Sequence, residues 1–458
     1  MFFAWLTSGP DNPIQLYPKG PLPRHKIPAW PFLDLMMGLR RRRNLRYRCS
    51  MKKHPDIAVL GGGLTGVSAA LELAKSGKDV VIIDQDARLL NRASLRNEGK
   101  IHLGLIYANE PSMLTAKLQL QGALTFHSLL AHWLGGKVEE IPVSTPFIYL
   151  VANTSLRSAE QLESHYSKLE SLYFSQIKQN PTLNYLGEQP EFLYRKSAAV
   201  PACFDAQAFS CGFETSERAI NSDVMAELLR RAVAEEEKIQ VVTGVRIREV
   251  TRKNGRMCVQ ASSSAGVWRQ EFDQVVNALW DGRIAIDSSC GLIPKPGWVY
   301  RLKYRTIVKL PKHLAGAPSA TIVLGRYGDV VIRPDQTAYL SWYPSGLKGW
   351  SHELEVPEHW APDCRGAARS SDALQIASET ITAIGNWYPG IEKSTLLQVD
   401  SGVICAFGKT DVDDSCSALH GRSDVGVTSE NGYHSVDPGK LTTAPLFGQR
   451  VAQIVLAQ

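Results

Sequence analysis

The sequence has 458 residues, of which 44% are hydrophobic and 21% are charged, so the chain can bury a large core and form two joined domains. No apolar run approaches the roughly 20 residues of a membrane-spanning helix, which leaves at most peripheral membrane contact. The net charge is +6, but residues 1–50 hold nine of the basic and only two of the acidic residues. The remainder is close to neutral and gives no reason to expect a nucleic-acid partner.

Residues 1–50 also carry seven prolines, which would interrupt any long helix. We therefore predict that this segment is a disordered, basic extension of the folded chain. Three roles remain open for it: a dispensable extension with Met51 as an alternative start, a targeting address, or a basic segment that contacts acidic lipid.

The eight cysteines are scattered, with no C-x-x-C pair and no spacing with His that is typical of a metal site. This pattern argues against both a zinc site and a disulfide framework. It predicts free thiols in a reducing compartment, and therefore a cytoplasmic protein without a structural metal.

The first predicted elements are a strand, a turn, a helix and a second strand. Residues 57–60 form a short apolar run that ends at glycines, residues 64–76 are good helix formers, and residues 79–84 form a second apolar run. This order is typical of the βαβ unit of a parallel sheet.

The turn of this unit has the pattern Gly61-x-Gly63-x-x-Gly66. Gly61 permits a tight turn, Gly63 lets the backbone approach a pyrophosphate, and Gly66 lets the helix pack closely on the strand. Leu64 and Thr65 begin the helix, whose first N–H groups would face the phosphates.

Asp84 ends the second strand, where its carboxylate can accept hydrogen bonds from the ribose of an adenosine group. Together with the glycine turn it predicts a dinucleotide site. The alternative is a glycine turn without a ligand, and the turn alone admits NAD as readily as FAD.

Later segments add helices and an antiparallel sheet. Apolar periodicity predicts helices over residues 111–135, 223–238 and 444–457. Strand-like stretches cover residues 239–250, 257–261, 272–277, 298–310 and 320–343, and the last two are rich in Tyr, Val and Ile.

The segment from Ser94 to Gly104 resembles the D-amino-acid oxidase-like flavoprotein superfamily, whose members carry an Asn- and Gly-containing segment that folds over the flavin. Its pattern Asn97-x-Gly99-x-Ile101-His102-x-Gly104, followed by Tyr107 and Ala116-Lys117-Leu118, is similar to the branch that contains L-2-hydroxyglutarate dehydrogenase. Glu98 and Lys100 depart from that branch. The resemblance implies FAD as the cofactor, with Ser94, Asn97 and Gly99 beside it.

Three later segments continue the resemblance in the same order. Residues 272–278 are similar to the strand that returns to the nucleotide, which implies a contact from Ala278, and residues 239–250 are similar to the strand that meets the adenine, at Ile247. Residues 432–441 are similar to the C-terminal flavin-binding segment and imply contacts from Gly439, Lys440 and Leu441.

The chain contains one G-x-G-x-x-G pattern, so no second dinucleotide domain for NAD(P)H is visible. Electrons are therefore expected to come from an organic substrate, which favours an oxidase or dehydrogenase acting on a CH–NH or CH–OH donor. A substrate carboxylate would suit a bidentate arginine, and Arg333 is the first candidate, with Tyr339 and Tyr343 nearby. The alternative for Arg333 is a surface position on a half-exposed strand.

Oxidation of an alcohol also needs a group that removes the hydroxyl proton, for which histidine is suited. His102 and His434 are the candidates, and each could instead be a packed or solvated histidine. Lys440 could stabilise reduced flavin, or contact a phosphate or solvent instead. Cys405 leaves open a covalent link to FAD, as in some amine-oxidising relatives.

The predicted fold is α/β, with a Rossmann-like FAD-binding domain of the glutathione-reductase type and an interleaved antiparallel-sheet substrate domain. The FAD-binding domain is assigned residues 51–135, 216–290 and 396–458. The substrate domain is assigned residues 136–215 and 291–395. The predicted function is oxidation of a small amino or hydroxy acid, with electrons passing to FAD and then to oxygen or a quinone-type acceptor. A flavoprotein acting on a larger molecule and a non-catalytic flavin-binding protein are the alternatives.

Overall fold

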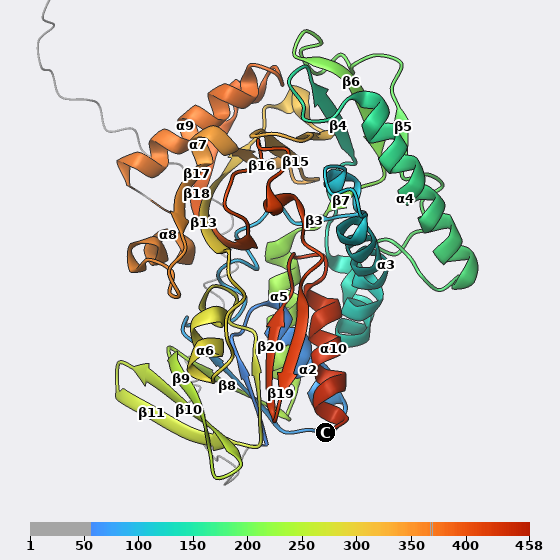
Figure 1. Cartoon of the computed structure of the whole chain (residues 1–458). Helices are drawn as coiled ribbons and strands as arrows, with labels where there is room; N and C mark the ends of the chain where they lie inside the picture. The colour runs from blue at the N-terminus through green and yellow to red at the C-terminus, as the bar shows by residue number, and fades with distance from the viewer. Residues whose placement is uncertain (1–55, 367, 369) are drawn as a thin grey trace, which may run out of the picture. The chain divides into compact units, whose positions relative to one another are not determined.

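The computed structural model describes residues 56–458 except residues 367 and 369 (Figure 1). The extension predicted over residues 1–50 lies outside the described residues. Within the described part, no helix is long and apolar enough to cross a membrane.

The predicted βαβ unit forms the centre of a six-stranded sheet. Helix α2 (Leu64–Lys75) connects two parallel neighbours, and an antiparallel strand closes one edge. In spatial order the strands are β19 (Gly426–Glu430), β20 (Tyr433–Asp437), β12 (Gln274–Asn277), β1 (Ile57–Leu60), β2 (Val80–Asp84) and β8 (Ile239–Thr243).

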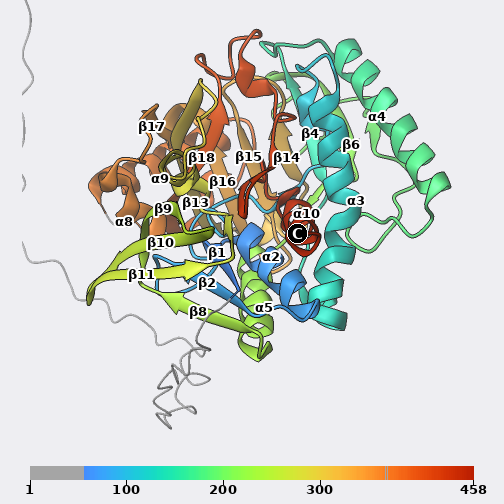
Figure 2. The same cartoon turned by 60° about the horizontal axis from the view of Figure 1, so that its bottom comes forward.

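The two faces of this sheet are buried by different layers because side chains alternate along each strand. Ile57 and Val59 pack with helices, whereas Ala58 and Leu60 pack with a second, three-stranded sheet (Figure 2). The helical layer consists of α2, α3 (Leu114–Leu134), α5 (Ser222–Glu235) and α10 (Ala444–Leu456). The opposite layer consists of β9 (Arg246–Lys253), β10 (Arg256–Ser263), β11 (Gly266–Phe272) and α6 (Arg283–Ser289).

Helices α2 and α10 approach each other closely at a glycine. A Cβ atom at Gly448 would lie 2.5 Å from Cβ of Ser68 and 2.9 Å from the carbonyl oxygen of Thr65. The last helix is therefore packed directly on the helix that follows the glycine turn.

A nine-stranded sheet forms the second large element. Most of its pairs are antiparallel, and β18 (Thr395–Phe407) pairs with β13 along the whole length of both strands. Its other strands in spatial order are β17 (Leu347–Ser351), β13 (Trp298–Lys309), β16 (Thr337–Trp342), β15 (Gly328–Ile332), β14 (Ser319–Ile322), β4 (Phe147–Ala152), β6 (Phe209–Thr215) and β5 (Tyr194–Lys196).

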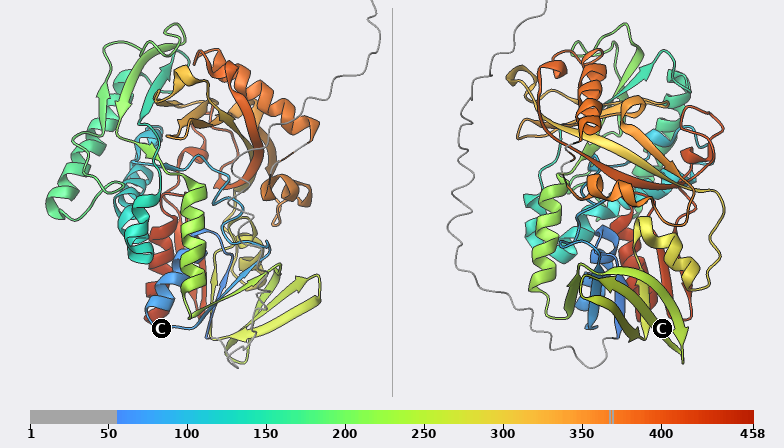
Figure 3. Two further views of the ribbon diagram at one scale, coloured as in Figure 1. Left: turned by 180° about the vertical axis from the view of Figure 1, so that it is seen from behind. Right: turned by 90° about the vertical axis from the view of Figure 1, so that its left-hand side faces the viewer.

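Helix α4 (Ala159–Gln179) packs on one face of this sheet, and the end of α9 (Ser371–Gly385) packs on the other (Figure 3). The short elements complete the chain. They are β3 (Lys100–Ile101) paired with β7 (Arg218–Ala219), α7 (Tyr343–Gly346), α8 (Ala361–Arg365), and the 3-10 turns Leu105–Tyr107, Gly135–Glu140, Trp280–Gly282, Lys312–Leu314, Glu358–Trp360, Ile391–Lys393 and Ala418–His420.

Two sequence-based expectations differ from the structure. The domain boundary at residue 396 assigned β18 to the FAD-binding domain, but its pairing with β13 joins it to the nine-stranded sheet. The strand predicted over residues 239–250 is two strands, because Gly244 turns the chain with φ of +72° between β8 and β9. The remaining domain boundaries stay predictions.

Candidate active site

The glycine turn has the backbone geometry that its sequence pattern predicts. Gly61 has φ of +95°, and its N–H group donates to the carbonyl oxygen of Ile83 at 2.8 Å. A Cβ atom at Gly66 would lie 2.0 Å from the carbonyl oxygen of Gly61, so only glycine allows this contact between helix and turn. The turning role of Gly61 and the packing role of Gly66 are confirmed.

Gly63 differs from these two glycines because it faces open space. Its backbone is extended, and a Cβ atom there would meet only the Ser94 hydroxyl, at 3.4 Å. Ser94 also accepts a hydrogen bond from the Leu64 N–H group at 2.9 Å. No described side chain caps α2 at its N-cap residue and no acidic residue lies in its first turn, which leaves this helix end suited to an anion.

Asp84 lies behind the turn. Its carboxylate accepts hydrogen bonds from the N–H groups of Gly62 at 2.6 Å and Asp86 at 2.8 Å. Burial raises the pKa of Asp84 to about 6. Ile247 is buried between the two sheets of this half. Neither side chain lines the cavity described below, so their contacts with adenosine remain predictions.

A cavity of about 310 Å³ extends from the start of α2 to the nine-stranded sheet. Predicted cofactor residues from four separate segments share its wall, together with Tyr339 of β16 and Tyr343 at the start of α7. These cofactor residues are Gly63, Leu64, Thr65, Ser94, Asn97, Ala278, Gly439, Lys440 and Leu441.

Basic side chains outnumber acidic ones on this wall. Glu98 and Asp329 are its carboxylates, against the basic residues Arg96, Lys100, Arg301, Lys303, Arg305, Arg422 and Lys440.

Some of these cations are neutralised by neighbouring carboxylates. Arg305 holds Asp400 with two hydrogen bonds of 2.5 and 3.1 Å, and Lys100 lies 2.8 Å from Asp329. Two further pairs join Arg301 to Asp411 at 3.4 Å and Arg96 to Asp400 at 3.3 Å.

Lys303, Lys440 and Arg422 form no ion pair with any residue in the described part of the chain. The Arg422 guanidinium instead donates to the carbonyl oxygen of Cys405 at 2.6 Å, and Lys303 Nζ lies 4.4 Å from the centroid of the Tyr343 ring. Two ammonium groups, those of Lys303 and Lys440, are therefore left facing the cavity without a carboxylate partner.

The charges on this wall influence one another. Burial disfavours a charge on Lys303, but Tyr339, Tyr343, Asp329 and Glu98 outweigh it and raise the Lys303 pKa. Burial lowers the pKa of Lys440, and the charge of Glu98 opposes this effect. Both pKa shifts thus reflect burial together with the charges of neighbouring groups on the cavity wall.

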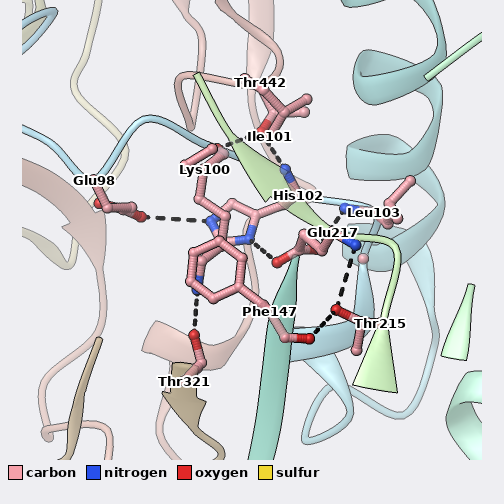
Figure 4. Close-up of polar contacts among 12 residues, drawn as sticks. Glu98, Lys100, Ile101, His102, Leu103, Phe147, Thr215, Glu217, Thr321 and Thr442 are labelled. Atoms are coloured by element: carbon pink, nitrogen blue, oxygen red, sulfur yellow. Dashed lines mark hydrogen bonds and ion pairs between the residues drawn. The ribbon is translucent and has the colours of Figure 1, made fainter. Parts of the chain in front are cut away.

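His102 lines this wall and lies between the carboxylates of Glu98 and Glu217 (Figure 4). Its Nδ1 atom is 3.4 Å from Glu217, its Nε2 atom is 3.6 Å from Glu98, and its backbone N–H donates to the Thr442 hydroxyl at 2.9 Å. The His102 side chain is 5% exposed, so these groups restrict its position.

Glu217 was not among the predicted site residues. It is fully buried and accepts hydrogen bonds from the Leu103 N–H group at 2.7 Å and from the Tyr149 hydroxyl. Burial alone would raise the pKa of Glu217, but His102 and the charge of Lys100 outweigh it and hold that pKa below its usual range. No motif surrounds Glu217, and only its tertiary position reveals it.

Two predicted catalytic residues, Arg333 and His434, do not line the cavity. Arg333 follows β15 and is 8% exposed, and its Nε and Nη2 atoms have no hydrogen-bond partner among the described residues. It does not line the cavity, and burial together with the charge of Arg305 lowers its pKa. The β15–β16 connection places Arg333 outside the cavity wall, and its expected carboxylate contact stays a prediction without support from this cavity.

His434 lies within β20 and is completely buried. Its ring bonds to the Ser429 hydroxyl and to the Gln274 side-chain oxygen, both at 2.9 Å. Burial lowers the His434 pKa to about 4. The pairing of β20 with β12 places His434 away from the cavity, which favours the alternative of a packed histidine, and its catalytic role stays a prediction.

Asn97 and Gly99 shape the loop that carries His102. The Asn97 side chain accepts from the Gly99 N–H group and donates to the Ala93 carbonyl oxygen, both at 2.7 Å. Gly99 has φ of +77° and does not line the cavity. Cys405 is buried on β18 away from the cavity wall, and burial raises its pKa to about 12, which disfavours a covalent flavin link.

Curated proteins match limited parts of the chain. The Probable oxidoreductase OrdL of Rhizobium meliloti is 30% identical over 123 residues, which are 27% of this chain and 26% of that protein. The mitochondrial L-2-hydroxyglutarate dehydrogenase of Arabidopsis thaliana is 34% identical over 71 residues, which are 16% of this chain and 14% of that protein. The matches thus span about a quarter or less of these relatives.

The fold as a whole is similar to that of solved flavoenzymes. Glycine oxidase from Geobacillus kaustophilus superposes with a TM-score of 0.61 at 15% identity, and the match covers 88% of this chain and 95% of that chain. The family model described as FAD dependent oxidoreductase (DAO) matches residues 56–454, from the first strand to the last helix. The resemblance deduced from the flavin-side segment is confirmed, and the chain belongs to the DAO family of FAD-dependent oxidoreductases.

Proposed function

We propose that this protein oxidises a small amino or hydroxy acid. The observation that carries the proposal is the pair of ammonium groups, on Lys303 and Lys440, that face the cavity without a carboxylate partner in the described chain. Buried charges are normally paired, so a ligand that brings a negative charge is favoured there. A carboxylate substrate supplies that charge.

The residues present fit FAD. The start of α2, which has no acidic residue in its first turn and open space beside Gly63, suits the pyrophosphate, and Asp84 and Ile247 are proposed to hold the adenosine end. Ser94, Asn97, Ala278 and residues 439–441 are proposed to line the flavin end, with Gly99 shaping the loop. When bound, FAD accepts two electrons as a hydride from a substrate carbon.

Lys303 is proposed to hold the substrate carboxylate. It lies on β13 between Arg301 and Arg305, both of which are already paired with carboxylates. Tyr343, stacked beside Lys303, can add a hydroxyl donor. Lys440 belongs to the proposed flavin segment and is assigned to the flavin side of the cavity, where it can stabilise negative charge on the reduced ring.

His102 is proposed to accept the proton that the substrate must lose from nitrogen or oxygen. Glu217 fixes the ring through Nδ1 and can stabilise its protonated form, as carboxylates do for histidine bases. Glu217 is thus a positioning residue. Its own position is fixed by Leu103 and Tyr149.

Electrons are proposed to leave the reduced protein for oxygen or a quinone-type acceptor. Besides FAD, the partner proposed for this cavity is the small-molecule substrate. A cytoplasmic location is also proposed, and it is supported by the described cysteines, all of which are free thiols.

Anaerobic reduction of the bound flavin tests the proposal. Purified protein would be mixed with a panel of amino and hydroxy acids, and loss of flavin absorbance would be followed. We expect at least one acid to bleach the flavin, and Lys303→Met to raise the half-saturating concentration of that acid, whereas Lys309→Met, an exposed lysine on the same strand, leaves it unchanged. Yellow protein that no acid reduces would favour a larger substrate or a non-catalytic flavin protein.

A further inference from the structure

Glu98 stands out among the acidic groups of the cavity. Of the two carboxylates on the described wall, Asp329 is held by Lys100 at 2.8 Å and by the Thr321 hydroxyl at 2.7 Å. Glu98 makes one ion-pair contact, with the His102 ring at 3.6 Å, and its side chain is 23% exposed. Because Glu98 lines the cavity, the exposed part of its side chain is available to a ligand.

We propose that Glu98 binds the α-ammonium group of the substrate, so that the substrate is an amino acid and not a hydroxy acid. This inference rests on the proposed function and names the substrate class of the same site.

The charges around Glu98 match a zwitterion. Lys303 and Lys440 are near enough to Glu98 for their charges to act on it, yet neither forms an ion pair with it within 4.0 Å. An α-amino acid carries a carboxylate and an ammonium group on one carbon, so it can satisfy Lys303 and Glu98 together. A hydroxy acid offers no cation, and its hydroxyl gives Glu98 a weaker, neutral donor.

Glu98 is also charged in the folded protein. Burial alone would raise its pKa, but the adjacent His102 ring and the charges of Lys440 and Lys303 outweigh it and hold the pKa well below the usual range. A fixed carboxylate therefore remains in the cavity at neutral pH, where amino acids carry an ammonium group.

The neighbouring histidine gives the ammonium proton a destination. An ammonium group must lose one proton before its nitrogen lone pair can assist hydride loss from the adjacent carbon. His102 Nε2 lies 3.6 Å from the Glu98 carboxylate, so a nitrogen bound to Glu98 would be next to a group that can accept this proton. Glu98 would then bind the amine and present it to His102.

Two unreactive analogues test the inference by binding alone. In 2-aminoisobutyrate and 2-hydroxyisobutyrate the α-carbon has no hydrogen, so neither can release a hydride, and binding is read from perturbation of the flavin spectrum. We expect the wild-type protein to bind the amino analogue about tenfold or more tightly than the hydroxy analogue, as for hydrogen bonds to charged groups. Glu98→Gln should bring this preference within about threefold. Lys303→Met should weaken both analogues alike.

Matched pairs of substrates give a second measurement. Alanine and lactate, glutamate and 2-hydroxyglutarate, and phenylalanine and phenyllactate would be compared for anaerobic flavin reduction in wild type and Glu98→Gln. Glu98→Ser replaces the glutamine variant if that variant loses its flavin. We expect amino acids to be preferred only in wild type.

Each contrary outcome has a distinct meaning. Reduction by hydroxy acids in preference to their amino partners, or an unchanged preference in Glu98→Gln, would overturn the role of Glu98 and leave the proposed function standing. If neither analogue perturbs the flavin and no acid of either class reduces it, the proposed function itself fails, and the inference with it.

Discussion

Replacement of Gly63 by aspartate should separate cofactor binding from folding. Gly63 is the N-cap residue of α2, its backbone is extended, and a Cβ atom there would meet only the Ser94 hydroxyl at 3.4 Å. Aspartate is among the preferred N-cap residues, so the apoprotein should keep its stability or gain about 0.5–1 kcal/mol. The carboxylate would nevertheless occupy the space proposed for the pyrophosphate.

The expected loss of FAD affinity follows from Coulomb repulsion. A carboxylate about 4 Å from a phosphate costs on the order of 4 kcal/mol at an effective dielectric constant of about 20. The dissociation constant of FAD should therefore rise by roughly 10²–10³-fold.

Flavin fluorescence titration would measure the affinity of Gly63→Asp, and thermal melts of the apoprotein would measure its stability. Gly63→Ser, an N-cap of similar size without charge, is the matched control and should lose much less affinity. Full flavin content in Gly63→Asp, with a dissociation constant near that of wild type, would refute the placement of the phosphates at this turn.

Three further perturbations test other parts of the structure. Gly66→Ala, whose Cβ would lie 2.0 Å from the Gly61 carbonyl oxygen, should lower the free energy of unfolding by about 3 kcal/mol in denaturant melts, and a neutral effect would contradict the observed packing. His434 has a pKa of about 4 against an ordinary 6.5, so the unfolded chain binds its proton first and stability should fall by up to about 3 kcal/mol as pH drops from 6.5 to 4. His434→Gln should flatten that slope in acid melts. Asp84, with a pKa near 6, is protonated at pH 5, and FAD should bind about tenfold more weakly there than at pH 7.5, a difference absent in Asp84→Asn.

Local patterns in the sequence predicted the cofactor half of the molecule well. Gly61 and Gly66 impose their geometry through φ and close contact, which neighbouring residues encode directly. The same holds for α2 and for the loop around Asn97. These features depend on a few adjacent residues, so a linear pattern contains most of the information.

The substrate side was predicted less well because it depends on strand pairing across long separations. Arg333 lies on the expected sheet, but the register that carries β15 past the cavity wall buries it beyond the site. Lys303 and Glu217 reach the cavity region from β13 and from the β6–β7 connection, and no local motif marks either residue. His434 was selected because the segment around it resembles a flavin-binding one, while the strand itself points its side chain into the core.

The packing of α10 on α2 through Gly448 has a consequence for the order of events during synthesis. A growing chain that has produced β1, α2 and β2 already contains the glycine turn, but it lacks β20, α10 and the cavity residues from 438 to 444. The pocket proposed for the cofactor can close only when the final part of the described chain has joined the first. Capture of FAD is therefore expected only after the chain has been translated as far as α10, the last helix of the described fold.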